Sequence, residues 1–339
     1  MVARPRTLAR SRTFDSLLVA AMGFVVLPVA APAAGEIVGI WNFTAADADG
    51  RVPNSRPGGG GSPAVLRDFD AESLAGTDVV LGDFTIVRDD TTTQVQVATS
   101  GWATFANVPD NGLDPGVATP VGPKALAVHA ANPGNWVHLP GVAGELVGRP
   151  GGAVRSFGVA LWVLVQTEQI DDRARFVSLN PLIRFAATDA RLFLHQTISD
   201  RIYTEDVGNG LGGARSYQIP FGRRLDATSR WVHLVMTGDG TANEFCIWVN
   251  GEAVNYTEPG QRSVPWPVGG GMQLSYRPGE PSDGAVLGRW LGGGAAPGKT
   301  FGLAAIVITA GEPITQERAR HLHQLGRRGL PFDGTWPTP

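Results

Sequence analysis

The feature that most constrains this fold is a series of short apolar runs, about four to eight residues each, with Gly, Pro, Asn or Asp between them. Of the 339 residues, 45 are Gly and 25 are Pro, which argues against long helices. Runs of this length and spacing predict an all-β sandwich of two antiparallel sheets. We expect strands at 36–43, 79–87, 93–98, 125–129, 136–139, 157–165, 176–179, 191–196, 231–236, 245–249, 284–287 and 302–309.

One of these runs, residues 231–236, shows which strands lie in the middle of a sheet. Alternation places its odd-numbered residues on one face and its even-numbered residues on the other. Both sets contain apolar side chains, so we expect a central strand. Trp162, Trp231 and Trp248 also lie in apolar runs, and we interpret them as core residues between the two sheets.

Near the C-terminus the pattern changes to that of a helix. Thr315 is a predicted N-cap, and the residues after it carry a narrow apolar stripe at helical spacing. Gly326 fits the position just after a helix, and Pro331 prevents its continuation. The sequence therefore predicts one C-terminal helix that packs on the sandwich.

A tight turn is predicted in the middle of the chain. The dipeptide Asn250-Gly251 directly follows the apolar run 245–249. Both residues tolerate positive φ, which a two-residue hairpin loop of type I′ requires. We therefore expect the chain to reverse there.

Composition and charge exclude several kinds of partner. The net charge is −3, the pI is about 6.1, and basic residues cluster only in the first dozen positions. We therefore expect no nucleic-acid partner and no polybasic membrane patch. Cys246 is the one cysteine, which excludes an intrachain disulfide, and its apolar neighbours predict a buried, unreactive side chain.

The first residues have the layout of a secretory signal. Four arginines within the first twelve residues precede an apolar stretch at 17–30, and the small residues Ala31-Pro32-Ala33-Ala34 follow. We expect residues 1–33 to be a signal peptide and residues 34–339 to form one domain that is secreted, periplasmic or at the cell surface. The alternative is an uncleaved anchor. No other segment is apolar for long enough to span a bilayer.

Four separated segments carry motifs in a fixed order. They are WNF at 41–43 with NS at 54–55, FGVALWV at 157–163, RWVHLVMTGDGT and WVNG within 230–251, and LGR at 287–289 with FGL at 301–303. Together with the terminal helix, they resemble the laminin-G-like jelly rolls of the concanavalin A-like lectin/glucanase superfamily, from about residue 36 to residue 328. The resemblance implies a two-sheet antiparallel jelly roll with one C-terminal helix, and a role in recognition.

The chain departs from that family in two places. The family usually has Asp and Glu after its Phe-x-Gly motif, where this sequence has Ala304-Ala305. Whatever those acids do in relatives cannot be done here by the same residues. The stretch 64–120 is longer than the resemblance leads us to expect, which suggests an insertion.

Two patterns would indicate nucleotide binding or glycan hydrolysis, but the neighbouring residues that each function requires are missing. Residues 293–300 match G-x-x-x-x-G-K-[ST], but a β-branched run follows instead of the helix that would meet phosphates. The acids within 168–172 lack the alternate spacing that would place a hydrolytic pair in one cleft. We therefore expect no bound nucleotide and no catalytic residues.

Two groups of acids are candidate calcium ligands. Asp47 and Asp49 form one group, and Asp110 and Asp114 form the other. Both groups also have the composition of ordinary turns, in which Asp and Asn cap their own backbone. No other cofactor is indicated.

Aromatic residues beside Gly, Pro or polar neighbours are the candidate ligand-binding residues. Exposed aromatics stack on sugar faces or anchor protein interfaces, and neighbouring arginines hydrogen-bond glycan hydroxyls or carboxylates. The alternative is that these aromatics pack loops on the sandwich. The candidates are Trp266, Tyr276, Arg277, Arg289 and Trp290.

These observations predict an exported, non-catalytic binding module. Its loops or its concave face would recognise a carbohydrate or an extracellular protein. Two alternatives remain open: a polysaccharide hydrolase or lyase on the same fold, and a structural cell-surface protein. Clustered carboxylates on the concave face would favour the enzyme. An exposed row of aromatic residues with Arg and Asn neighbours would favour glycan binding, and a broad apolar patch would favour a protein partner.

Overall fold

The computed structural model describes residues 36–69, 79–80, 83–88, 91–96, 101–104, 111–129, 135–147, 153–165, 183–185, 191–197, 201–207, 215–220, 231–253, 264–265, 272–273, 283–287 and 300–337. All of them belong to the compact unit 31–339. Within these ranges, no helix has both the length and the apolar character that a bilayer crossing requires.

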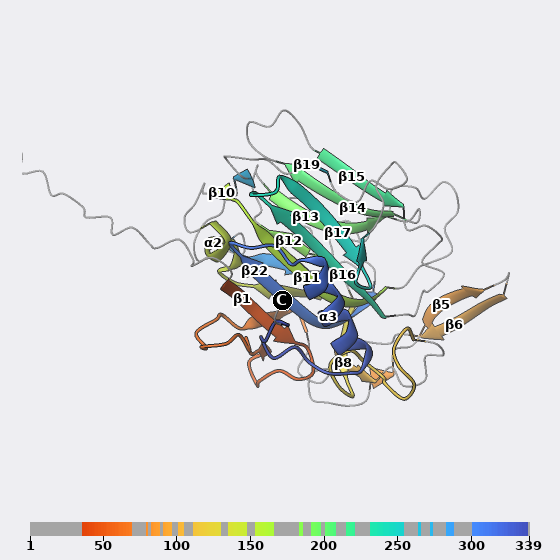
Figure 1. Cartoon of the computed structure of the whole chain (residues 1–339). Coiled ribbons are helices and arrows are strands. Elements are labelled where there is room, and N and C mark those ends of the chain that lie inside the picture. The colour runs from red at the N-terminus through yellow and green to blue at the C-terminus, as the bar shows by residue number, and fades with distance from the viewer. Residues whose placement is uncertain are drawn as a thin grey trace, which may run out of the picture. The chain divides into compact units, whose positions relative to one another are not determined.

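Two large sheets form the molecule, as predicted (Figure 1). Nearly all of their strand pairs are antiparallel, the exception being the short pair β4–β7. The first sheet has ten strands in the order β18-β17-β16-β11-β22-β8-β7-β4, with β1 added on β22 and β19 on β17. Their bounds are β1 (Glu36–Asn42), β4 (Val79–Val80), β7 (Gly101–Thr104), β8 (Ala125–His129), β11 (Phe157–Val165), β16 (Trp231–Asp239), β17 (Glu244–Val249), β18 (Glu252–Ala253), β19 (Val264–Pro265) and β22 (Thr300–Ala310).

The second sheet has eight strands in the order β15-β14-β13-β12-β21-β9-β3-β2. Two further strand pairs, β10–β20 and β5–β6, form small sheets of their own. The bounds are β2 (Arg51–Val52), β3 (Ala64–Arg67), β5 (Asp83–Arg88), β6 (Thr91–Gln96), β9 (Trp136–Leu139), β10 (Ala153–Val154), β12 (Ile183–Phe185), β13 (Arg191–Thr197), β14 (Arg201–Val207), β15 (Arg215–Pro220), β20 (Met272–Gln273) and β21 (Ala285–Leu287). A six-residue helix, α2 (Val142–Val147), follows β9 and was not predicted.

Most predicted strands are present with small changes at their ends. The prediction of one strand at 79–87 is wrong, because the structure divides that stretch into β4 and β5, in different sheets. The predicted strand at 176–179 lies outside the described residues. Within 64–120, the predicted insertion, β3 and β7 join the two large sheets, whereas β5 and β6 pair only with each other.

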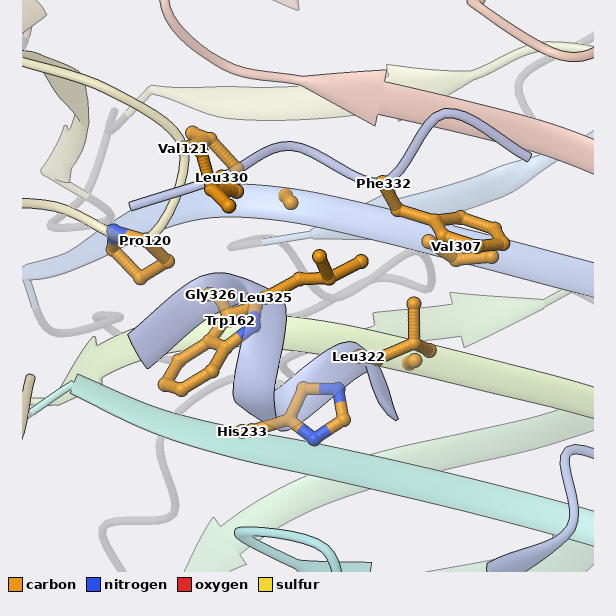
Figure 2. Close-up of a pocket in the computed structure, with 12 residues that line it drawn as sticks. Pro120, Val121, Trp162, His233, Val307, Leu322, Leu325, Gly326, Leu330 and Phe332 are labelled. Carbon is orange, nitrogen blue, oxygen red and sulfur yellow. The ribbon is translucent and has the colours of Figure 1, made fainter. Parts of the chain in front are cut away.

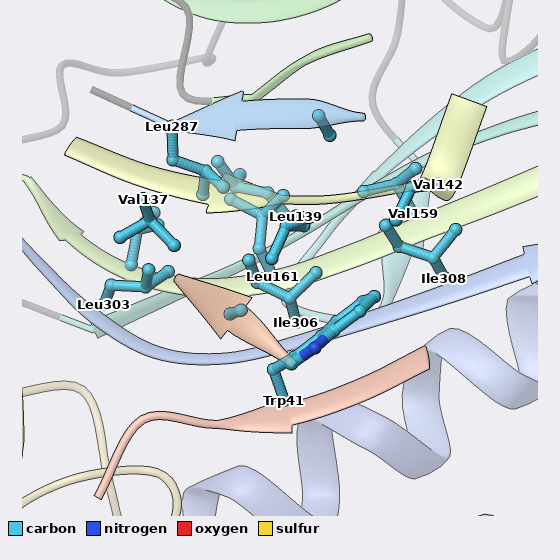
Figure 3. Close-up of a cluster of buried hydrophobic side chains, with 14 of the residues drawn as sticks. Trp41, Val137, Leu139, Val142, Val159, Leu161, Leu287, Leu303, Ile306 and Ile308 are labelled. Atoms are coloured by element: carbon cyan, nitrogen blue, oxygen red, sulfur yellow. The ribbon is translucent and has the colours of Figure 1, made fainter. Parts of the chain in front are cut away.

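The main core lies between the two large sheets and takes side chains from both (Figure 3). Leu161 and Ile306 of the first sheet meet Leu139 of the second there. Trp41 lies in the same core with 1% of its surface exposed, and its Nε1 donates to the Ser62 carbonyl at 3.1 Å. The buried ring fixes β1, and its polar atom keeps a partner.

A second apolar layer covers the outer face of the ten-stranded sheet. Trp162 and Trp231 are buried there together with Ala304 and Ala305. The prediction that these tryptophans fill the space between the sheets is therefore wrong, although burial itself is confirmed for both. The reason is the alternation along β16, where the odd-numbered residues face outward and the even-numbered residues reach the main core. Trp248, partly buried, also packs on the outer face.

Helix α3 (Gln316–Arg327) covers this outer face (Figure 1). Its predicted N-cap is confirmed, since the Thr315 hydroxyl accepts from the Arg318 amide at 3.3 Å. The prediction for its C-terminal end is wrong, because Gly326 lies inside the helix and Gly329 takes the left-handed conformation with φ of 70°. Gly326 is needed within the helix because a Cβ there would overlap the indole of Trp162.

The predicted hairpin at Asn250-Gly251 is confirmed. Both residues have positive φ, 52° and 79°, and join β17 to β18. The Asn250 side chain also accepts from the backbone amide of His233 at 2.9 Å, which ties the turn to the neighbouring strand. The thiol of Cys246 is buried as predicted, and burial, with the nearby Glu244 carboxylate, raises its pKa to about 12.

After α3, the chain turns back as a C-terminal tail, residues 330–337. Phe332 anchors it in the apolar layer beneath the helix, next to Val307 (Figure 2). Gly334 passes so close to Pro57 that a Cβ there would overlap the proline ring. The ring of Trp336 packs against Phe332, with 4.5 Å between ring centroids. The tail is thus fixed along its length against α3 and the 53–63 loop.

Candidate functional site

Figure 2 shows a cavity beneath α3 that is too small to be a ligand site. Its volume is about 20 Å³, room for roughly one water molecule. The lining is apolar except for His233, whose ring lies beside Trp162 with 5.0 Å between centroids. This space is a packing gap between the helix and the sheet.

A larger, open hollow lies where β1 ends and β2 begins, and we call it the groove. Its volume is about 610 Å³, within the range of small-molecule sites. Its walls come from four separate parts of the chain: the end of β1 with the loop after it, the segment 51–63, the turn at Val121, and the C-terminal tail at Pro331. The lining residues are Asn42, Thr44, Ala45, Ala46, Asp47, Arg51, Pro53, Ser55, Pro63, Val121 and Pro331.

The polar side chains of the groove carry both donors and acceptors. Thr44 and Ser55 contribute hydroxyls, Asp47 a carboxylate and Arg51 a guanidinium. Asn42 contributes an amide whose Oδ1 atom is buried without a hydrogen-bond partner. The set suits a ligand that is rich in hydroxyl groups.

The walls of the groove are fixed by hydrogen bonds of the backbone. Asn54 joins the 53–63 segment to β1, since its Oδ1 accepts from the Ile40 amide at 3.1 Å and its Nδ2 donates to the Val38 carbonyl at 3.2 Å. The Ser55 amide donates to the Ile40 carbonyl at 2.8 Å. A site held in this way loses little conformational entropy when a ligand binds.

Of the predicted calcium ligands, Asp47 caps a turn and Asp114 pairs with an arginine. Asp47 Oδ1 accepts from the amides of Asp49 and Arg51, at 2.9 and 2.8 Å, which closes the loop at the edge of the groove. Asp114 forms an ion pair with Arg327 at the end of α3. Across the described ranges, no group of three metal-ligating side chains is found. Asp110 lies outside the described residues.

A second polar cluster lies on the outer face of the eight-stranded sheet, at β9. The indole of Trp136 donates to Asp68 Oδ2 at 3.1 Å, and Asp283 accepts from the Gly141 amide at 3.1 Å. His138 lies 3.9 Å from that carboxylate, measured from its Nε2 to the Asp283 Oδ1. Trp136 and His138 are 6% and 4% exposed, so this cluster is covered and joins loops to the sheet.

The predicted ligand-binding residues cannot be compared with the groove. Trp266, Tyr276, Arg277, Arg289 and Trp290 all lie outside the described residues. Within the described part, sequence reasoning found Asp47 but missed the other groove residues. Ser55 belongs to the NS motif at 54–55, which contributed to the family resemblance but was not predicted to be part of a binding site.

Comparisons with known proteins give similarities of fold. No family model matches the chain, and no curated protein matches it. Among solved structures, domain 4 of AbnA, a GH43 extracellular arabinanase from Geobacillus stearothermophilus solved in complex with arabinotriose, is 13% identical, with a TM-score of 0.45 over 86% of this chain and 100% of that chain.

Two further solved structures are similar with lower TM-scores. The binding domain of botulinum neurotoxin DC, in complex with rat synaptotagmin II, is 10% identical over 73% of this chain and 51% of that chain, with a TM-score of 0.39. The CBM40 of the Ruminococcus gnavus IT-sialidase, bound to α2,3 sialyllactose, is 10% identical over 50% of this chain and 84% of that one, with a TM-score of 0.33. Likeness of this degree concerns the β-sandwich alone.

Proposed function

We propose that this chain is an exported, non-catalytic carbohydrate-binding module of the laminin-G-like type, and that the groove holds the sugar. The observation that carries the proposal is the lining of the groove. Two hydroxyls, an amide, a carboxylate and a guanidinium surround a space of about 610 Å³ on a fixed backbone. A sugar offers many hydroxyls that both donate and accept, and this set can meet them.

The apolar part of the lining also fits a sugar. Pro53, Pro63 and Pro331 line the groove alongside the polar side chains. Proline rings expose aliphatic carbon, which can pack against the C–H face of a sugar ring while the hydroxyls at its edge reach the polar groups. A protein partner is supported less, because Leu330 is the one large apolar residue of the described part that is clearly exposed, at 42%.

The first test is binding of the full chain to an array of plant, bacterial and animal glycans, followed by titration calorimetry with the glycan that binds. Arg51→Ala removes the exposed guanidinium of the groove, and we expect it to weaken binding about tenfold or more. The matched control is Arg67→Ala, which removes an exposed guanidinium from the end of β3, and it should bind like wild type.

Two other arms separate the alternatives. Trp266→Ala and Trp290→Ala test the aromatic residues predicted from the sequence. If these variants lose glycan binding and Arg51→Ala does not, the binding site is not the groove. We expect a calcium chelator to leave binding unchanged, since the Asp47 carboxylate already accepts two backbone amides. Absence of binding to every glycan would contradict the proposal and favour a structural role.

A further inference from the structure

A second hollow adjoins the groove, on the other side of Pro331. Its volume is about 270 Å³, and it opens between α3 and the C-terminal tail. His321 of α3 and Asp333 and Thr335 of the tail supply its polar groups, and the rest of its lining is apolar. Pro331 lines both hollows and is exposed, so the two hollows are neighbours at this residue.

The tail beside the second hollow has a hydrogen bond and a cation–π contact of its own. The Asp333 carboxylate accepts from the Thr335 amide at 2.8 Å, which fixes the turn of the tail and lowers the pKa of Asp333. Trp336, at its edge, lies under the guanidinium of Arg318, 4.8 Å from the ring centroid. The two hollows therefore keep their relative positions without help from a ligand.

The charges of the two hollows indicate what kind of chain they accept. The groove carries one carboxylate, on Asp47, and one guanidinium, on Arg51. The second hollow adds the carboxylate of Asp333, with His321 as its basic group. Among the lining groups, the two aspartates outnumber the one arginine, so a chain with a carboxylate on each sugar would meet a net repulsion that weakens its binding. An uncharged chain meets no such repulsion.

We infer that the two hollows form one extended site for a linear, uncharged oligosaccharide, which crosses over Pro331 and places sugars on both sides of it. This inference rests on the function proposed above and extends it from a single sugar to a chain. A ligand that fills both hollows gains contacts in the second hollow that a short ligand in the groove does not make. Affinity should therefore rise with chain length until both hollows are filled.

The test compares disaccharides with hexasaccharides of the same series, using cello-, xylo- and arabino-oligosaccharides and, as the acidic probe, oligogalacturonates. We expect calorimetry to show at least tenfold tighter binding of the hexasaccharide than of the disaccharide in one neutral series. The oligogalacturonate hexamer should bind more weakly than that neutral hexasaccharide.

Variants of the second hollow then locate the added contacts. His321→Ala should lower the ratio of hexasaccharide to disaccharide affinity, whereas Arg51→Ala should weaken both ligands and leave the ratio nearly unchanged. If His321→Ala folds poorly, the same ratio is measured for Asp333→Asn, which keeps an acceptor for the Thr335 amide. It should lower the ratio in the same way. Gln324→Ala, an exposed position on the same helix, is the control.

The outcomes distinguish the two proposals. If no glycan binds, the proposed function itself fails. If glycans bind but affinity does not depend on length, or if His321→Ala leaves the ratio unchanged, the groove acts alone and the extended site is wrong. Tighter binding of the acidic hexamer than of every neutral one would overturn the assignment to an uncharged chain.

Discussion

Gly326 decides how closely α3 approaches the sheet. A glycine inside a helix usually costs stability, and its replacement by alanine usually adds about 1 kcal/mol. Here a Cβ would overlap the Trp162 indole, which is buried on the face of the sheet below. The local preference for alanine and the packing therefore act in opposite directions, and packing is the larger effect.

We expect Gly326→Ala to destabilise the protein by about 1–3 kcal/mol, the usual cost of overpacking. The measurement is the free energy of unfolding in urea, followed by tryptophan fluorescence. Gln324→Ala, at an exposed position of the same helix, should be neutral or slightly stabilising. A stabilising Gly326→Ala would mean that the helix lies farther from Trp162 than described.

His323 of α3 and His233 of the sheet below it form a pair that should make the stability of the protein depend on pH. The ring of His233 is stacked on that of His323, with centroids 6.1 Å apart and 20° between the planes. Burial, with His323 nearby, lowers the pKa of His233 to about 3. Burial, with the Arg327 guanidinium adding to it and the carboxylates of Asp114 and Glu252 opposing it, lowers the pKa of His323 to about 4.

The sign of the pH dependence follows from these directions. Unfolded histidine has a pKa of about 6.5, so the unfolded chain binds more protons than the folded chain at pH values below that. The free energy of unfolding should therefore fall as the pH is lowered from about 7.5 towards 3, and these groups should contribute almost no slope at higher pH. His323→Phe keeps an aromatic ring without a proton site.

Urea midpoints measured between pH 7 and pH 4 test this. We expect the midpoint of His323→Phe to fall less in acid than that of the wild type, and Gln324→Ala, at an exposed position of the same helix, to behave like the wild type. Equal acid sensitivity in all three proteins would show that the stacked pair is not its source.

At the scale of elements, helix α3 depends on its first turn. The helix has twelve residues, and its N-cap hydroxyl on Thr315 satisfies one of the amides that the first turn leaves without a partner. Thr315→Ala should lower the free energy of unfolding by about 1 kcal/mol. Thr241→Ala, at an exposed turn residue, is the control, and an equal loss in both variants would argue against the cap.

Strands with strong apolar alternation could be predicted from the sequence, and others could not. Both faces of β16 are buried, so apolar residues run along its whole length. Its position inside a sheet, and the division of its odd- and even-numbered residues between the two faces, were therefore predicted correctly. β14 and β15 (RIYTEDV and RSYQIP) mix charged and apolar residues and were missed. The end of α3 was misplaced because two glycines, Gly326 and Gly329, compete for it and only tertiary packing decides between them.

The candidate site was hardest to predict, for a similar reason. The groove combines Asn42, Arg51, Val121 and Pro331, which are far apart in the sequence and meet only because β1 pairs with β22 and the tail returns past them. Each of these residues by itself belongs to an ordinary turn or strand end. The sequence pattern therefore gives no sign of such a site. An aromatic residue beside an arginine is recognisable within a few positions, and such residues were therefore predicted as the ligand-binding residues.

At the scale of the whole molecule, the sandwich brings its N-terminal strand and its C-terminal tail to one end of the structure. β1 pairs with β22 from Glu36↔Ala310 to Asn42↔Ala305, and the tail then crosses the outer side of β1 near Ile40. The groove lies at this junction. The site that we propose therefore depends on the closed fold and is not carried by any single loop.

Hydrogen exchange of the full chain, with and without the hexasaccharide that binds most tightly, tests this account most directly. We expect the sugar to slow exchange in peptides that cover residues 42–55 and 331–337, and to leave β13, β14 and β15 unchanged. Protection of residues 191–220 with none at 42–55 would contradict it, because the sugar would then lie on the face of the eight-stranded sheet.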